Sequence, residues 1–222
     1  MRIIAGEFRG RQLKAPKGSG TRPTTDRVRE ALMSALASAR GGLEGAVVLD
    51  AFAGSGALSF EALSRGAACS QLYERDRAAL SALMENAKAL RLPSSRARIH
   101  RADVFKTPPS FANPPFDLVF LDPPYAYVAG DVLGLVARLV RGGVVADGAI
   151  VVYEHAAVDS PSVDEAAQAN GLALASRKKY GDTCVDLLRI ACSGEGVAAG
   201  KASASDDAPE ADEGDRKERS AE

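Results

Sequence analysis

The sequence predicts an α/β fold built on a mostly parallel sheet. Short apolar runs alternate with helical patterns between residues 46 and 170, and this alternation is typical of a doubly wound parallel sheet. Two further strand patterns, 172–180 and 183–191, follow each other across Gly181 and Asp182 and predict an antiparallel hairpin at the edge of the sheet. At 222 residues the chain has room for one well-cored domain and a tail.

The N-terminal part predicts a small basic hairpin or extended arm followed by a helix. In "MRIIAGEFRGRQLKAP" two short alternating runs surround Gly6 and Gly10. Thr25 is the expected N-cap of the helix, and Asp26 suits the positive end of its dipole. An apolar stripe then continues at Val28, Ala31, Leu32, Ala35 and Leu36.

The remaining elements follow from the spacing of apolar residues and from the breakers between them. An Asp147–Gly148 turn is expected before the last of the parallel strands. The expected strands are 46–50, 70–74, 97–103, 116–122 and 149–155, and the expected helices are 57–65, 78–90, 131–141 and 162–170.

Composition narrows the class of protein. Two histidines, and three cysteines without metal-ligand spacing, argue against a metal site and indicate reduced thiols. No apolar run approaches the length of a membrane span, and the N-terminus carries Arg2 rather than the apolar core of a signal peptide. We therefore expect a cytoplasmic protein with no membrane contact. Because no long apolar segment lacks a partner in this scheme, we expect a monomer.

Charge is segregated along the chain. Residues 1–40 carry a net charge of +6 and residues 193–222 a net charge of −5, although the whole chain carries −1. The basic end favours contact with a polyanion, and the alternative is an ordinary solvated surface. The acidic end has too few large apolar side chains to offset chain entropy, so we expect it to be disordered. The predicted division is a basic arm over 1–24, a core domain over 25–192 and a disordered tail over 193–222.

The stretch "LDAFAGSG" predicts a ligand-binding loop. A strand that ends in Asp50 and continues into glycines lets the backbone approach a nucleotide-like cofactor closely. The dinucleotide pattern G-x-G-x-x-G fails, because Ser59 stands at its third glycine position. An acidic residue ahead of the loop suits a ligand with an ammonium group, such as S-adenosyl-L-methionine. The expected contacts in this loop are Asp50, Ala51, Phe52, Ala53, Gly54, Ser55 and Gly56.

Two more acidic residues end neighbouring strands of the predicted sheet. Glu74 ends the second strand, where a carboxylate can accept hydrogen bonds from both ribose hydroxyls of an adenosine. Asp103 ends the third strand, where it can accept from an adenine amino group. Val104 or Phe105 would then line the adenine slot. Each residue alone is also compatible with an ordinary exposed acid at a strand terminus.

The stretch "FDLVFLDPPYAY" predicts the chemistry of the site. An exocyclic amine of a nucleobase is a poor nucleophile, and two acceptors aimed at its hydrogens help it attack a methyl sulfonium. Asp122 supplies one acceptor and the Pro123 carbonyl the other, with Pro123 and Pro124 holding the backbone stiff. Tyr125 can stack on a base that has been pulled out of its helix. Such catalysis depends on positioning and electrostatics; the competing interpretation is a rigid turn.

These motifs also carry a family resemblance. The loop at 50–56 followed by Asp-Pro-Pro-Tyr resembles class I S-adenosylmethionine-dependent amino-methyltransferases, with a seven-stranded Rossmann-like sheet. Together with "RIIAGEFRGRQL", "RPTTDRVREAL" and "VLDAFAGSGALSFEALSRGA", it resembles the bacterial RsmD family over roughly residues 1 to 190. The resemblance implies transfer of a methyl group to the N2 of a guanine in 16S ribosomal RNA, in the small subunit or its precursor.

The resemblance also implies where RNA is bound. It assigns RNA contact to the basic arm and to the segment from Arg22 to Arg29. The residues expected to contact RNA are Arg9, Arg11, Lys14, Arg22, Thr25 and Arg27.

Two other functions stay open at this level. Asp-Pro-Pro-Tyr also serves methylation of DNA adenine or cytosine, although about 190 ordered residues leave little room for a DNA-recognition domain. A noncatalytic RNA-binding assembly protein with the same fold is the second alternative, and the intact acceptor pair at Asp122 argues against it.

Overall fold

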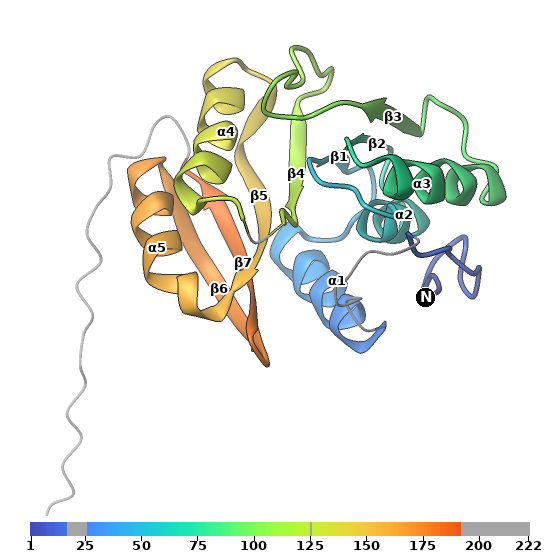
Figure 1. The fold of residues 1–222 in the computed structure, drawn as a ribbon, viewed down its shortest axis with the longest axis horizontal. Coiled ribbons are helices and arrows are strands. Elements are labelled where there is room, and N and C mark those ends of the chain that lie inside the picture. Colours follow the sequence, from blue (N-terminus) through green and yellow to red (C-terminus); the bar gives the residue numbers. More distant parts are fainter. Residues whose placement is uncertain (17–25, 125, 192–222) are drawn as a thin grey trace, which may run out of the picture.

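Seven strands form one sheet in the computed structural model, which describes residues 1–16, 26–124 and 126–191. The strand order is β3-β2-β1-β4-β5-β7-β6 (Figure 1). The first five strands are parallel, and β7 and β6 pair antiparallel with their neighbours, which confirms the predicted fold class. The strands are β1 (Val47–Asp50), β2 (Cys69–Glu74), β3 (Ala97–Arg101), β4 (Phe116–Leu121), β5 (Val145–Ala156), β6 (Leu172–Tyr180) and β7 (Thr183–Ile190).

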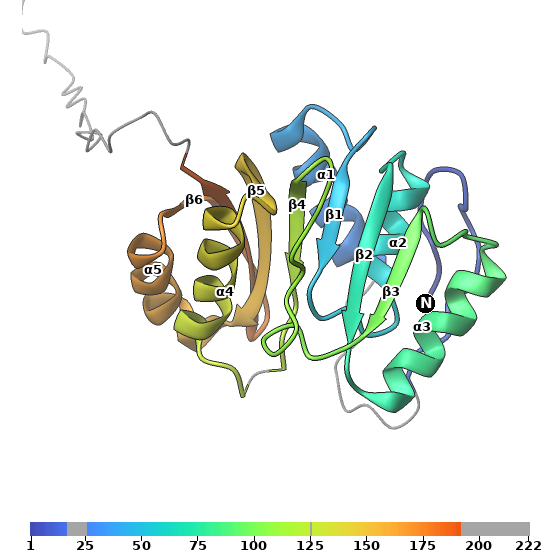
Figure 2. The same cartoon turned by 90° about the horizontal axis from the view of Figure 1, so that it is seen from above.

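Helices cover both faces of this sheet, as Figure 2 shows. The helices are α1 (Asp26–Arg40), α2 (Ala57–Ser64), α3 (Arg77–Ala89), α4 (Ala129–Arg141) and α5 (Ser160–Ala169), with a short 3-10 turn at Ala157–Asp159. In β4, Leu118 and Phe120 face the core under α1, α2 and α3, while Val119 and Leu121 face the core under α4 and α5. Burial on both faces explains why these strands are continuous apolar runs in the sequence. Within the described ranges, no helix has the length and apolarity needed to cross a bilayer.

The expected turn at Asp147 and Gly148 is wrong. Both residues lie inside β5, which already begins at Val145. Gly148 has a φ of 71°, and the pairing with β4 shifts register between Phe116 and Leu118. A glycine that would serve a turn serves a β-bulge here, because tertiary pairing continues on both sides of it.

The N-terminal segment 1–16 is a hairpin-like loop held against α2. One antiparallel bridge joins Arg2 to Gln12, and the side chains of Ile3, Phe8 and Leu13 are buried in the core. The tip of the loop lies at the C-terminal end of α2, where the Glu7 N–H donates to the Ser64 carbonyl at 2.7 Å. The expected N-cap Thr25 and the tail 193–222 lie outside the described residues, so the domain boundaries stay a prediction.

Glu61 of α2 anchors this segment. Its side chain is fully buried and accepts hydrogen bonds from the Ile4 and Ala5 amides at 2.9 and 3.1 Å. Arg65 donates to the same carboxylate at 2.8 Å, and the buried Arg29 lies 3.9 Å from it. Two backbone amides and two arginines therefore converge on one carboxylate, which compensates the cost of burying its charge.

We predict that Glu61→Ala destabilises the fold strongly. Removing this carboxylate leaves Arg65 and the Ile4 and Ala5 amides without their acceptor and takes one of two acidic neighbours from the buried Arg29. Breaking comparable buried ion pairs costs roughly 3–5 kcal/mol. Urea unfolding of Glu61→Ala measures the loss, with the exposed Glu30→Ala on α1 as the control, expected within about 0.5 kcal/mol of wild type. A loss no larger than that of the control would contradict the anchoring role.

Candidate active site

The loop between β1 and α2 turns at the carboxyl edge of the sheet. Gly54 and Gly56 have φ values of 55° and 82°. A Cβ at Gly56 would stand 2.3 Å from an atom of Phe60 and 2.6 Å from an atom of Leu83. A Cβ at Gly54 would meet no atom within 4 Å. Core packing therefore requires a glycine at position 56, while Gly54 leaves the outer side of the loop open to a ligand.

Asn86 of α3 joins this loop to the N-terminal segment. Its side chain is 1% exposed and donates to the carbonyls of Ser55 at 2.9 Å and Lys14 at 3.0 Å. Its oxygen accepts the Lys14 N–H at 2.7 Å. A buried amide with three hydrogen bonds fixes both segments in one geometry. Nothing in the helical pattern marked Asn86, because asparagine is mostly exposed in proteins.

Asp50 ends β1 as predicted, but its carboxylate is buried. It is 2% exposed and accepts a 2.7 Å hydrogen bond from Ser59 Oγ. Burial raises the pKa of Asp50 to about 7, the bond from Ser59 opposes this rise, and Glu74 adds to it. With so little exposed surface, Asp50 can act on a ligand through its charge more than through direct contact.

Glu74 lies beside the open glycine. Its carboxylate accepts hydrogen bonds from the N–H groups of Gly54 at 2.8 Å and Asp76 at 2.6 Å. Asp76 in turn caps α3 by accepting from the Ala79 N–H at 2.8 Å. The acid expected at ribose hydroxyls is therefore at the correct strand end, and it also fixes the conformation of the glycine loop.

Asp103 stands two residues beyond the end of β3. Its two oxygens accept from the Phe105 N–H and from Arg75 Nη1, both at 3.0 Å. Burial alone would raise the pKa of Asp103, but these two bonds outweigh it and lower the pKa. Val104 is 2% exposed and packs in the core. Of the two residues expected to line an adenine slot, Phe105 alone presents its side chain to a cavity.

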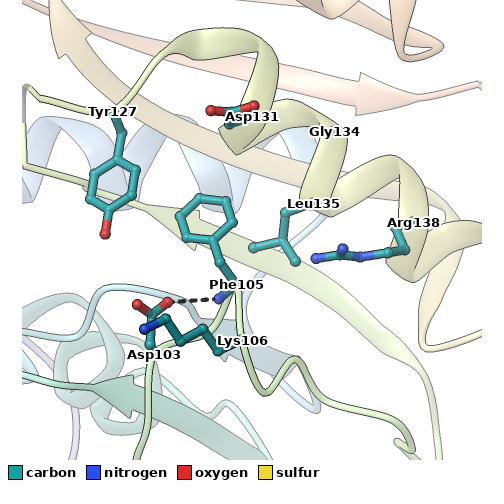
Figure 3. A pocket seen from close by; sticks show the side chains of 8 residues that line it. All are labelled: Asp103, Phe105, Lys106, Tyr127, Asp131, Gly134, Leu135 and Arg138. Carbon is teal, nitrogen blue, oxygen red and sulfur yellow. Dashed lines mark hydrogen bonds between the residues drawn. The ribbon is translucent and has the colours of Figure 1, made fainter.

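That cavity, of about 460 Å³, lies between the loop after β3 and helix α4 (Figure 3). Its size falls within the range of small-molecule sites. The loop after β3 contributes Asp103, Phe105 and Lys106, α4 contributes Leu135 and Arg138, and Tyr127 closes one side.

An aromatic cluster connects this cavity to the glycine loop. The ring of Phe105 stacks on Tyr127 with centroids 5.1 Å apart, and Phe52 of the glycine loop lies 5.9 and 5.8 Å from these two rings. The guanidinium of Arg75 lies 5.5 Å from the Tyr127 ring centroid. Sequence reasoning missed Tyr127 and Arg75; the signal for Tyr127 was a second tyrosine close behind Asp-Pro-Pro-Tyr.

The fourth strand delivers Asp122 to the same edge of the sheet. Asp50 pairs with Phe120 across β1 and β4, so the glycine loop and Asp122 leave neighbouring strands at one end. Pro123 is buried and Pro124 exposed, and the Pro124 carbonyl accepts from the Tyr127 N–H at 3.1 Å. Tyr125 lies outside the described residues.

The carboxylate of Asp122 titrates abnormally. Asp122 is exposed at the protein surface, yet the many protein atoms around its carboxylate displace enough water to raise its pKa well above the ordinary range. The charges of Glu154 and Asp50 add to this rise. Glu154 of β5 was not expected from the sequence.

The residues expected to contact RNA are spread over the molecule. Arg9, Arg11 and Arg27 are exposed, and Lys14 forms an ion pair with Glu85. Arg9 and Arg11 lie at the tip of the N-terminal loop, at the opposite end of α2 from the glycine loop. Arg22 and Thr25 lie outside the described residues.

One implied contact is wrong: Arg29 does not face solvent. It is 1% exposed and donates to the carboxylate of Asp26 at 2.8 Å and to the carbonyl of Arg2. A guanidinium enclosed in this way cannot reach a phosphate.

The chain is similar to known proteins along most of its length. A family model described as "Conserved hypothetical protein 95" matches residues 1–189. "Ribosomal RNA small subunit methyltransferase D" of Escherichia coli K12 is 45% identical over 125 residues, which are 56% of this chain and 60% of that protein. The protein of the same name from Haemophilus influenzae is 41% identical over 130 residues, covering 57% of this chain and 65% of that protein. The matches thus span less than two thirds of these curated relatives.

A solved structure extends the likeness. "Putative methyltransferase yhhF" from Escherichia coli superimposes with a TM-score of 0.69 at 33% identity, and the match covers 86% of this chain and 98% of that one. The fold described above is therefore shared over nearly the whole of that protein.

We predict that the two glycines of the loop differ in their tolerance of a methyl group. Gly56→Ala should destabilise the protein by about 2–4 kcal/mol, because left-handed strain of 1–2 kcal/mol adds to overpacking against Phe60 and Leu83. Gly54→Ala is the matched control, because it introduces the left-handed strain without any overpacking. Urea unfolding of both variants measures the difference, and equal losses would show that the close approach does not limit position 56.

Proposed function

The chain belongs to the conserved hypothetical protein 95 family, the RsmD family, and from this membership we propose that it is an S-adenosylmethionine-dependent methyltransferase acting on 16S ribosomal RNA. The target is the exocyclic N2 of a guanine in the small ribosomal subunit or its precursor, in the cytoplasm. One observation carries the proposal: the glycine loop and the Asp122–Pro123 segment leave neighbouring parallel strands at one edge of the sheet. That edge is where open α/β sheets bind their ligands.

The residues present fit the methyl donor. Gly54 leaves the loop open on its outer side, and the carboxylate of Glu74 lies next to it. Asp103 and Phe105 border a cavity of about 460 Å³, large enough for a purine ring. When bound, S-adenosylmethionine supplies the methyl group on its sulfonium. The glycine loop would receive the methionine part, Glu74 the ribose, and Asp103 with Phe105 the adenine.

The catalytic work falls to the segment after β4. Asp122 and the Pro123 carbonyl would each accept a hydrogen bond from the target amine, which orients its lone pair toward the methyl group. Pro123 is buried and has a fixed φ, so the direction of its carbonyl is stiff. No covalent intermediate with the protein is needed, since positioning and charge supply the rate. Tyr125 would stack on the extruded guanine.

We predict that Asp122→Asn strongly slows methyl transfer but keeps donor binding. Losing the acceptor charge should lower the rate by roughly a hundredfold or more, while affinity for S-adenosylmethionine stays within about threefold, because Asp122 is assigned to the amine. Transfer of labelled methyl groups to small subunits from cells lacking this protein measures the rate, and calorimetry measures the affinity. Asp182→Asn, an exposed residue in the β6–β7 turn, is the control. Equal loss of rate and affinity would remove the assignment.

The same assay tests the substrate. Mapping of the modified nucleotide should find one guanine carrying the methyl group on N2, and duplex DNA should accept none. Methylation of DNA instead of ribosomal RNA, or absence of donor binding, would overturn the proposed function.

We further predict that Arg9 and Arg11 contact phosphates. The double variant Arg9→Gln/Arg11→Gln should bind ribosomal RNA more weakly, and the slope of log affinity against log salt should fall by about one for each lost contact. Filter binding over a range of salt concentrations measures this slope. Arg141→Gln, at the exposed end of α4, is the matched control. An unchanged slope would show that the tip of the N-terminal loop is only a solvated surface.

A further inference from the structure

Asp122 has a carboxylate neighbour on the next strand. Leu121 of β4 pairs with Tyr153 of β5, so the residues that follow them, Asp122 and Glu154, come side by side at the end of the sheet. Parallel strands lie about 4.8 Å apart, and paired positions point to the same face. The positions two residues earlier, Phe120 and Val152, both lie in the core under α1, α2 and α3. Continuing this alternation one residue beyond the end of β4 puts Asp122 on the same face as Glu154, and the charge of Glu154 acts on Asp122.

Neither carboxylate has a compensating partner within the described part of the chain. No hydrogen bond or ion pair from these residues reaches Asp122 or Glu154. Two fully buried carboxylates each have a cation: Glu61 is paired with Arg65 at 2.8 Å, and Asp186 with Arg177 at 2.7 Å. Among the residues that the structure describes, no cation in direct contact therefore offsets the repulsion between these two acids.

Of the other charges near the pair, those around Asp122 add to the repulsion, and His155 partly offsets it at Glu154. Asp50 approaches Asp122 from β1 and adds a further negative charge, and Glu74 acts on Asp50 in the same sense. Burial raises the pKa of Glu154, and the neighbouring His155 opposes this rise without reversing it. The ring of His155 is itself hydrogen-bonded to Asp186 of β7, with 3.1 Å between Nε2 and Oδ2.

We propose that Glu154 is a positioning residue for the methyl transfer, whose charge keeps Asp122 a strong enough base to take the proton that the target amine releases. The inference rests on the proposed function and extends it to a residue that does not touch the substrate.

The proton balance of methyl transfer shows why Asp122 has to act as a base. The amine nitrogen forms a bond to the methyl carbon, the carbon–sulfur bond breaks, and its electron pair stays on sulfur. The nitrogen becomes positively charged and must lose a proton. Asp122 accepts it and later releases it to solvent. Proton transfer is most efficient when the base has a pKa near the working pH, which an ordinary aspartate lacks.

The causes that raise the pKa of Asp122 also give the direction in which a change at Glu154 moves it. Burial raises the pKa of Asp122 first, and the charge of Glu154 raises it further. Replacing Glu154 by glutamine removes that charge and must lower the pKa of Asp122. Asp122 then stays deprotonated to lower pH, but it holds a proton less strongly.

A pH profile tests this consequence. For Glu154→Gln, single-turnover methyl transfer between about pH 5 and pH 9 should show its acid limb moved to lower pH, with a plateau rate reduced by up to about tenfold. Glu154→Asp keeps the charge and should keep an acid limb close to that of wild type. Glu165→Gln, exposed on α5, is the control and should change neither. An acid limb that Glu154→Gln leaves in place would overturn the proposal.

Titration without substrate separates the two proposals. In ¹³C NMR of carboxyl-labelled protein, Glu154→Gln should lower the pKa of Asp122, and Asp122→Asn should lower that of Glu154, because the coupling of two sites is reciprocal. If these shifts occur but wild type transfers no methyl group, the carboxylate pair stands and the proposed function fails. If wild type transfers methyl groups but neither variant shifts the other acid, the pair fails and the function stands.

Discussion

The parallel pairing of β1, β4 and β5 is the constraint on which the site depends. It sets Asp50 beside Phe120 and Leu121 beside Tyr153, so Asp50, Asp122 and Glu154 meet at one edge of the sheet. Carboxylates brought together in partial burial repel one another and hold protons more strongly than in water. The fold thereby produces an unusually basic aspartate next to a glycine loop, without any special residue type.

The second constraint is the attachment of the N-terminal segment to α2 and α3. Glu61 binds two amides of this segment, and Asn86 binds both Lys14 and the carbonyl of Ser55 in the glycine loop. Both side chains are almost completely buried, so their hydrogen bonds are costly to break. The segment is part of the architecture that holds the loop, although its composition suggested only a surface arm, for contact with a polyanion or for solvent.

The placement of charge bears on how a ribosomal substrate would lie. The tip of the N-terminal loop, with Arg9 and Arg11, lies by Ser64 at the end of the sheet where the parallel strands begin. Asp122 lies at the other end. An RNA that reaches both under the proposed function has to extend from one end of the parallel strands to the other. Such a footprint fits a folded particle better than a short single strand.

The sequence by itself determined the fold class, nearly all helices and strands, the glycine loop and Asp122, because these follow from local periodicity, breakers and turn residues. Tertiary structure decided the rest. It buried Arg29 against Glu61, turned Val104 into the core and Phe105 toward the cavity, and converted Gly148 from a turn into a bulge. It also brought Glu154 close enough for its charge to act on Asp122. Each of these depends on the register or packing between segments far apart along the chain, and no local pattern encodes which residues will become neighbours there.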